Sequence, residues 1–264
     1  MTYLHGYADA VLRSQRWRSV ENSAGYLRDL LSEGTSVLDV GCGPGSLTLD
    51  IARLVAPGRV VGVDAEPTVL AEARAAAKDQ SLDNVEFHEG DACALGYDDS
   101  SFDIAHAHQL LQHLAHPERA LAEMGRVTRA GGHVAARDTD YSSWTWFPEA
   151  PLLERWRALY REVARQNGGE PDAGRRLKSW ALAAGLEGIS SSASAWCFST
   201  LDDRSWWAEI WAERTSSGRL GEQAVALGLA ATTELDELAT AWRRWALEPA
   251  GWLAVVHGEV LCSL

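Results

Sequence analysis

Apolar positions along the first half of the chain alternate between short continuous runs and helical spacings. Runs of strand length occur at residues 36–40, 59–63, 84–89, 102–107 and 133–137. Helical spacing covers residues 20–32, 47–55, 67–77 and 117–128, with proline near two helix starts and glycines after the last helix. Repeated strand–helix units predict a parallel sheet with helices on both faces.

The second half of the chain has a different pattern. Two further strands are predicted near 189–197 and 252–261, while 141–173 and 200–249 are largely helical in pattern. Eleven of the 12 tryptophans follow residue 140. We therefore expect an α/β fold: a doubly wound, mostly parallel seven-stranded sheet with helical insertions that form a cap.

The length of 264 residues fits a single domain with insertions. We expect residues 1–35 to form an N-terminal helical lid, 36–140 the core, and 141–173 with 200–249 the cap. The tryptophans of the cap have two interpretations, packing between the inserted helices or lining an apolar acceptor pocket.

Charge and composition narrow the possible partners and compartment. With 24 basic and 37 acidic residues the net charge is −13, which argues against nucleic acid and anionic membrane surfaces as partners. No apolar run approaches the roughly 20 residues of a membrane span, and the N-terminal stretch lacks the apolar segment of a signal peptide. Four cysteines without a C-x-x-C pair suit reduced thiols, so a cytoplasmic protein is expected.

A glycine-rich turn follows the first predicted strand. It reads Asp39-Val40-Gly41-Cys42-Gly43-Pro44-Gly45, with spacing G-x-G-x-G rather than the G-x-G-x-x-G of dinucleotide sites. It also lacks the Gly-Lys-Ser/Thr ending of a P-loop. Asp39 would repel a pyrophosphate and suits a cationic ligand.

Two more acids stand at successive strand ends. Asp64 ends the second predicted strand, where an acid can accept hydrogen bonds from both ribose hydroxyls. Asp91 follows the third, where a carboxylate can take the exocyclic amine of adenine. Because ligands of open parallel sheets bind at the carboxyl ends of the strands, the three acids describe ribose, adenine and a cationic tail without phosphate. This combination indicates S-adenosylmethionine.

Four segments in order resemble the motifs of class I S-adenosylmethionine-dependent methyltransferases, in the branch of the ubiquinone and menaquinone C-methyltransferases. They are VLDVGCGPG, VVGVDAEPTVLAEAR, EGDACAL and FDIAHAHQLLQHLAHPERALAEMGRVTRAGGHV. The leading stretch YLHGYADAVLRSQRW also resembles the cofactor lid of some members. The resemblance covers about residues 35–138.

The resemblance assigns roles to residues at the matching positions. It implies that Gly41 and Gly43 pass close to the amino-acid part of the cofactor, with Asp39 near its amino group. Asp64 would bind the ribose and Asp91 the adenine, beside Ala65 and Ala92. Ala107 and His108 would flank the sulfonium, and Tyr3 and His5 would close over the cofactor.

The segment after the fourth strand bears on the acceptor. It lacks the Asn/Asp-Pro-Pro-aromatic motif of enzymes that methylate amino groups of DNA bases, so we expect a small organic acceptor methylated on O, N or C. A base is needed only if the nucleophile must lose a proton, and the candidates are His108, Asp138 and Asp140. Each has an alternative structural role, and no metal site is expected.

The aromatic residues Tyr141, Trp144 and Trp146 are predicted to line the acceptor pocket. Two other functions stay open from the sequence. One is an NAD-dependent oxidoreductase, against which the glycine spacing and Asp39 count. The other is a non-catalytic S-adenosylmethionine-binding scaffold or sensor, since binding motifs encode binding and not transfer.

Overall fold

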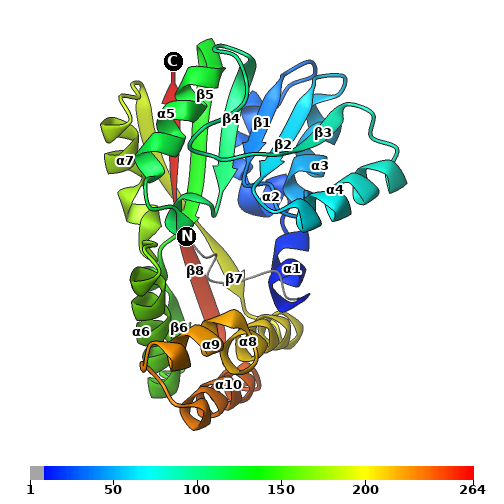
Figure 1. The fold of residues 1–264 in the computed structure, drawn as a ribbon. Helices are drawn as coiled ribbons and strands as arrows, with labels where there is room; N and C mark the ends of the chain where they lie inside the picture. Colours follow the sequence, from blue (N-terminus) through cyan, green and yellow to red (C-terminus); the bar gives the residue numbers. More distant parts are fainter. Residues whose placement is uncertain (1–8) are drawn as a thin grey trace.

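A computed structural model describes residues 9–264 and shows the predicted alternation of strands and helices in the first half of the chain (Figure 1). The strands of this half are β1 Val37–Val40, β2 Val60–Asp64, β3 Val85–Glu89, β4 Phe102–His108 and β5 Thr128–Thr139. Its α-helices are α1 Asp9–Arg16, α2 Val20–Ser23, α3 Ser46–Val55, α4 Pro67–Asp79 and α5 Pro117–Val127. Short 3-10 helices lie at η1 Gly25–Leu30 and η2 Leu111–His113.

The second half adds the elements of the cap and the last strands of the sheet. Its strands are β6 Thr145–Phe147, β7 Ile189–Phe198 and β8 Trp252–Ser263. Its α-helices are α6 Pro151–Gln166, α7 Leu177–Ala183, α8 Leu201–Ser216, α9 Arg219–Ala226 and α10 Thr232–Ala246, with 3-10 helices η3 Tyr141–Ser143 and η4 Ala173–Arg176.

All of these strands belong to one sheet in the order β3-β2-β1-β4-β5-β8-β6, with β7 also paired to β8. The five strands from β3 to β5 are parallel, and β8 runs antiparallel to β5, β6 and β7. The doubly wound, mostly parallel α/β fold is therefore confirmed. The sheet has eight strands rather than seven because β6 pairs with the first residues of β8.

Helices cover both faces of the parallel part of the sheet (Figure 1). On one face α5 and α7 bury Leu121, Met124 and Leu177 against Leu38 and the neighbouring strands. On the other face α2, α3 and α4 form two further clusters, around Ile51 and around Leu70. Since the faces are closed, the carboxyl edge of the strands is left for ligands.

The cap lies beyond that edge, where the extended ends of β7 and β8 reach α6, α8, α9 and α10 (Figure 1). Its core is one cluster rich in aromatic residues, in which Trp156, Trp211 and Trp242 are almost fully buried. Helix α1 connects the two parts: Arg214 of α8 donates to the carbonyl of Ala10, and Arg16 pairs with Glu72 of α4.

One expectation about local structure was wrong. Residues 20–32 do not form one helix, because Ala24, at φ −139° and ψ 26°, ends α2 and the chain continues as the 3-10 helix η1. The segment 141–173 is largely helical, as expected, but it also contains the short strand Thr145–Phe147, which pairs with β8. Among residues 9–264 no helix is long and apolar enough to cross a membrane.

Candidate cofactor and acceptor site

The glycine turn between β1 and α3 has a backbone that only glycine adopts readily. Gly41, Gly43 and Gly45 have φ of +76°, +54° and +81°. A Cβ on Gly41 would lie 2.9 Å from Leu110 Cδ1, and one on Gly43 would lie 3.3 Å from Gln15 Oε1. The turn thus passes close beneath Leu110 and Gln15, and a side chain at either glycine would intrude on the space between them.

The acid at the end of β2 is tied to this turn. Asp64 accepts hydrogen bonds from the backbone N–H of Gly43 at 2.9 Å and of Glu66 at 3.0 Å. Burial raises the pKa of Asp64 despite these hydrogen bonds. Asp64 therefore fixes the turn as well as presenting a carboxylate at the strand end.

The other two acids differ in their surroundings. Asp91 is exposed and accepts from the N–H of Cys93 at 2.8 Å. Asp39 is buried; one of its oxygens accepts from the Thr48 hydroxyl at 2.6 Å and the other lies 3.0 Å from His106 Nδ1. Because both carboxylate oxygens of Asp39 already have a side-chain partner, a ligand would have to share one of these oxygens with Thr48 or His106.

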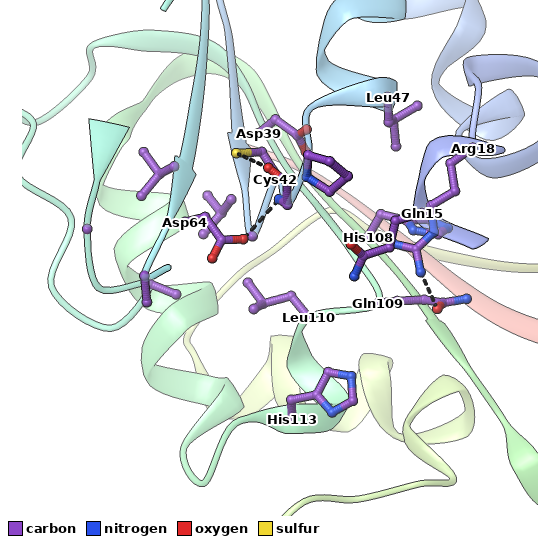
Figure 2. Close-up of a pocket in the computed structure, with 18 of the residues that line it drawn as sticks. Gln15, Arg18, Asp39, Cys42, Leu47, Asp64, His108, Gln109, Leu110 and His113 are labelled. Carbon is purple, nitrogen blue, oxygen red and sulfur yellow. Dashed lines mark hydrogen bonds between the residues drawn. The ribbon is translucent and has the colours of Figure 1, made fainter. Parts of the chain in front are cut away.

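These acids surround one cavity of about 240 Å³ at the carboxyl edge (Figure 2). Most of the residues predicted to bind the cofactor line it, namely Asp39, Gly41, Gly43, Asp64, Ala65, Asp91, Ala92 and His108. Ala107 is fully buried in β4 and is not among the lining residues. Tyr3 and His5 lie outside the described residues.

His108 is held in its neutral form by a neighbouring arginine. Arg137 Nη1 lies 2.8 Å from His108 Nε2, and because a guanidinium only donates, this nitrogen accepts. Burial and the charges of Arg18 and Arg137 hold the pKa of His108 well below its usual value. With its basic nitrogen occupied, His108 is poorly suited to remove a proton from an acceptor.

The other two candidate bases, Asp138 in β5 and Asp140 just after it, are not among the residues that line the cavity. Asp138 is fully buried and accepts from the N–H groups of Leu111 and Gln112, each at 3.3 Å; burial raises its pKa to about 7. Its carboxylate orders the loop after β4, which carries lining residues such as Leu110.

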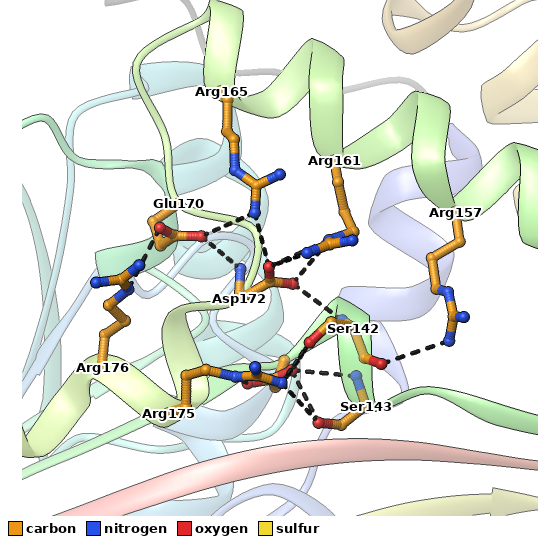
Figure 3. Close-up of polar contacts among 10 residues, drawn as sticks. Ser142, Ser143, Arg157, Arg161, Arg165, Glu170, Asp172, Arg175 and Arg176 are labelled. Carbon is orange, nitrogen blue, oxygen red and sulfur yellow. Dashed lines mark hydrogen bonds and ion pairs between the residues drawn. The ribbon is translucent and has the colours of Figure 1, made fainter.

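Asp140 belongs to a different network, at the start of the cap. Figure 3 shows its partners Ser142, Ser143 and Arg175. Asp140 accepts from Ser142, Ser143 and Arg175, and it caps η3. Burial alone would raise the pKa of Asp140, but these hydrogen bonds outweigh burial and lower it. These contacts give Asp140 a structural role, and its catalytic role stays a prediction.

A second, smaller cavity of about 20 Å³ adjoins the first on the side of the cap. We call it the inner pocket; the residues it shares with the larger cavity are Gln15, Arg18, Gln109 and His113. Its aromatic walls are Tyr141, Trp144, Trp196, Trp207 and Trp211. Two of the predicted acceptor-site residues, Tyr141 and Trp144, therefore line it, and they stack at 4.7 Å.

Trp146 lies elsewhere. It is 9% exposed and packs in the cap core with the Arg157 guanidinium 4.9 Å from its ring. It is not among the residues that line the two cavities, so the structure separates it from Tyr141 and Trp144. On β6 the side chain of Trp146 is buried in the cap core, whereas the side chains of Thr145 and Phe147 on either side of it are exposed.

Sequence reasoning missed a polar chain at the junction of the two cavities. Arg18 Nη2 donates to Gln109 Oε1 at 2.8 Å (Figure 2). Gln109 Nε2 lies 2.9 Å from His257 Nε2. Gln109 has φ +51°, an uncommon backbone for this residue type and a recurrent mark of functional sites. Its position directly after the fourth strand was the only signal available in the sequence.

Residues 31–191 match the model of a family described as a methyltransferase domain. An uncharacterized methyltransferase of Schizosaccharomyces pombe is 32% identical over 271 residues, which cover 98% of this chain and 95% of the relative. The chain belongs to the methyltransferase domain family. It is an S-adenosylmethionine-dependent methyltransferase, as the four motifs implied.

Two further comparisons extend this assignment. The demethylmenaquinone methyltransferase of Lactococcus lactis is 33% identical over 128 residues, which cover 48% of each chain. The resemblance to the quinone methyltransferase branch is thereby confirmed. The crystal structure of the YcgJ protein of Bacillus subtilis superposes with a TM-score of 0.59 at 20% identity, over 90% of this chain and 97% of that one, and shows the shared fold.

The cavity fits the cofactor that the family implies. The turn leaves out side chains at Gly41 and Gly43, where a Cβ would reach Leu110 and Gln15. The acids at the ends of β2 and β3 offer acceptors for hydroxyl and amino groups, and the described lining contains no lysine of the kind that holds a triphosphate in a P-loop. Among the described residues no cluster of three or more His, Cys, Asp or Glu side chains could hold a metal ion.

Proposed function

We propose that this methyltransferase transfers a methyl group to a small organic acceptor with an aromatic or hydrophobic body. The observation that carries the proposal is that the two cavities adjoin: four residues line both an acid-lined cavity at the strand ends and a pocket walled by aromatic side chains. Aromatic side chains beside this junction suit an acceptor of that kind.

Within the larger cavity we assign each acid one part of the cofactor. Asp64 accepts from the ribose hydroxyls and Asp91 from the adenine amine, with Ala65 and Ala92 beside the base. Gly41 and Gly43 allow close approach of the amino-acid part, and Asp39 attracts its amino group. The support is that all of these residues line one cavity.

The chain's own contribution to the reaction is positioning and exclusion of water. When bound, the cofactor supplies an electrophilic methyl group on its sulfonium, and the acceptor's electron pair displaces the sulfur as the new bond forms. His108 and Gln109 at the end of β4 position the reacting groups at the junction, and the cap aromatics exclude water. No lining residue needs to take part covalently.

The charge balance and the cysteines support the remaining parts of the proposal. A net charge of −13 disfavours nucleic acid as the acceptor. All four cysteines are free thiols, which suits the reducing cytoplasm.

The test is a labelling experiment with methyl-labelled S-adenosylmethionine. The enzyme is incubated separately with the small-molecule, protein and nucleic-acid fractions of a cell extract, and Asp64→Ala serves as the variant with a weakened cofactor site. We expect label in the small-molecule fraction, less of it with the variant. Label confined to the protein or nucleic-acid fraction would contradict the proposal.

A further inference from the structure

The walls of the inner pocket present hydrogen-bond donors and cations but no carboxylate. Its described lining includes Arg18 and Arg214 and contains no Asp or Glu. Arg214 is 7% exposed, so its charge lies within the protein rather than at the surface. The chain as a whole has a net charge of −13, so this pocket is a local region of positive charge in a negatively charged protein.

Two tryptophans that line this pocket, Trp144 and Trp207, have an indole N–H that is buried without a hydrogen-bond partner. Both side chains are 3% exposed. A buried donor without a partner is destabilising, and an oxygen atom placed in the pocket would relieve that cost. Trp242 and Trp245 also carry unpartnered N–H groups but are not among the pocket residues, so they provide matched controls.

The size of the inner pocket limits what can enter it. A volume of about 20 Å³ holds a group the size of one water molecule. A whole ring does not fit, whereas an oxygen substituent does. The body of the molecule then lies at the junction, beside Gln109 and His113, which line both cavities.

We propose, on the basis of the function proposed above, that the acceptor carries an anionic oxygen, as in a carboxylate, phenolate or enolate. This oxygen enters the inner pocket, where it accepts hydrogen bonds from Trp144 and Trp207 and lies in the field of Arg18 and Arg214.

The lining histidines are consistent with an acceptor that is already ionised. Burial lowers the pKa of His113 to about 3, and the pKa of His108 is also held well below its usual value. Neither ring is an effective base at neutral pH. An acceptor that carries its own negative charge needs no base for deprotonation of that oxygen.

The proposal is tested by comparing the binding of 2-naphthoate with that of its neutral isostere 2-naphthamide and the cation 2-naphthylmethylamine. Each is titrated into the full-length enzyme with saturating S-adenosylhomocysteine, and tryptophan fluorescence and calorimetry report binding. We expect the carboxylate to bind at least about tenfold tighter than the amide, as for a hydrogen-bonded charge, and the amine to bind weakest.

The variants Trp144→Phe and Trp207→Phe remove an N–H and keep an aromatic ring. Each is expected to reduce the preference for the carboxylate severalfold, while the matched variant Trp242→Phe leaves it unchanged; thermal melting confirms that all three are folded. Equal binding of carboxylate and amide, no binding of naphthoate, or the same loss in Trp242→Phe would overturn the proposal. Failure of the parent to bind S-adenosylhomocysteine would instead count against the cofactor assignment on which the proposed function rests.

Discussion

The cofactor cavity and the inner pocket lie side by side but are built in opposite ways. Around the cofactor cavity, polar groups are set by strand ends and main-chain hydrogen bonds, as with Asp64 and the N–H of Gly43. Around the inner pocket, side chains from separate parts of the cap pack against one another, as with Trp144 and Trp211 at 5.6 Å. Topology positions the first and aromatic packing positions the second, so substitutions in the two regions should have different effects.

The largest effect is expected for a tryptophan at the centre of the cap. Trp156 is fully buried, contacts Trp144, Trp211 and Trp242, and donates to the Thr215 hydroxyl at 3.0 Å. Trp156→Ala should lower the free energy of unfolding by about 3–5 kcal/mol, as measured by urea denaturation.

The control for that variant is Trp180→Ala, because Trp180 is only half-buried, against the helices of the sheet. It should lose clearly less stability. We expect Trp245→Ala, Trp144→Ala and Trp146→Ala to behave like Trp156→Ala, since all of these residues lie in the same cap cluster. Equal stability of Trp156→Ala and the parent would show that packing does not hold the cap together.

At the core edge, a substitution should affect ligand binding more than folding. Asp64→Ala removes an acceptor for ribose and the anchor for Gly43, so we expect cofactor affinity to fall about 10- to 100-fold, equivalent to roughly 1.5–3 kcal/mol. Calorimetry with S-adenosylhomocysteine measures it, and the exposed Asp83→Ala is the control. Undiminished affinity in Asp64→Ala would make the ribose assignment wrong.

A comparison of alanine variants at two glycines distinguishes the effect of backbone strain from the effect of lost space at the turn. Gly34 and Gly41 have φ of +86° and +76°, but a Cβ on Gly34 meets nothing within 4 Å whereas one on Gly41 meets Leu110. Both Ala variants should lose about 1–2 kcal/mol of stability from the left-handed backbone. Only Gly41→Ala should also bind S-adenosylhomocysteine more weakly, severalfold; equal affinities would show that the turn tolerates a side chain.

A pH dependence of stability is expected from Asp138. Because its pKa is raised to about 7 from an ordinary value of 3.8, the folded state holds a proton that the unfolded state has lost between those pH values. Stability from this group is thus fully present below about pH 4 and is lost as pH rises through 7, by about 1.4 kcal/mol per pH unit between the two pKa values and about half of that per unit at pH 7.

Melting of Asp138→Asn and the parent between pH 5 and 8 measures this dependence. The stability of the variant relative to the parent should increase with pH across that range, and buried histidines present in both proteins cancel in the difference. A constant difference would place the pKa of Asp138 outside this window.

Much of the core could be predicted from the sequence because its signals are local. Most of the parallel strands contained short apolar runs, while β3 (VEFHE) has only two apolar residues and was predicted from its place in the strand–helix alternation. Asp64 and Asp91 were located by following the strand ends. The partners of Asp39 could not be predicted in this way, because His106 faces it only through the register of β1 and β4.

The cap shows the limits of such reasoning. Strand β6 has only three residues, too few to show a periodic pattern in the sequence. It is a strand because it pairs with β8. The different environments of Trp144 and Trp146 depend on that pairing. Arg137 contacts His108 and favours its neutral form. Nothing in the sequence around Arg137, which precedes Asp138 in a strand, predicted this contact.

The central claim is that the acids at the strand ends form a site for S-adenosylmethionine rather than for a dinucleotide. Its most direct test is calorimetric titration of the parent enzyme with S-adenosylhomocysteine and, separately, with NAD. We predict that S-adenosylhomocysteine binds and that NAD gives no measurable heat of binding. Tighter binding of NAD than of S-adenosylhomocysteine would contradict the account.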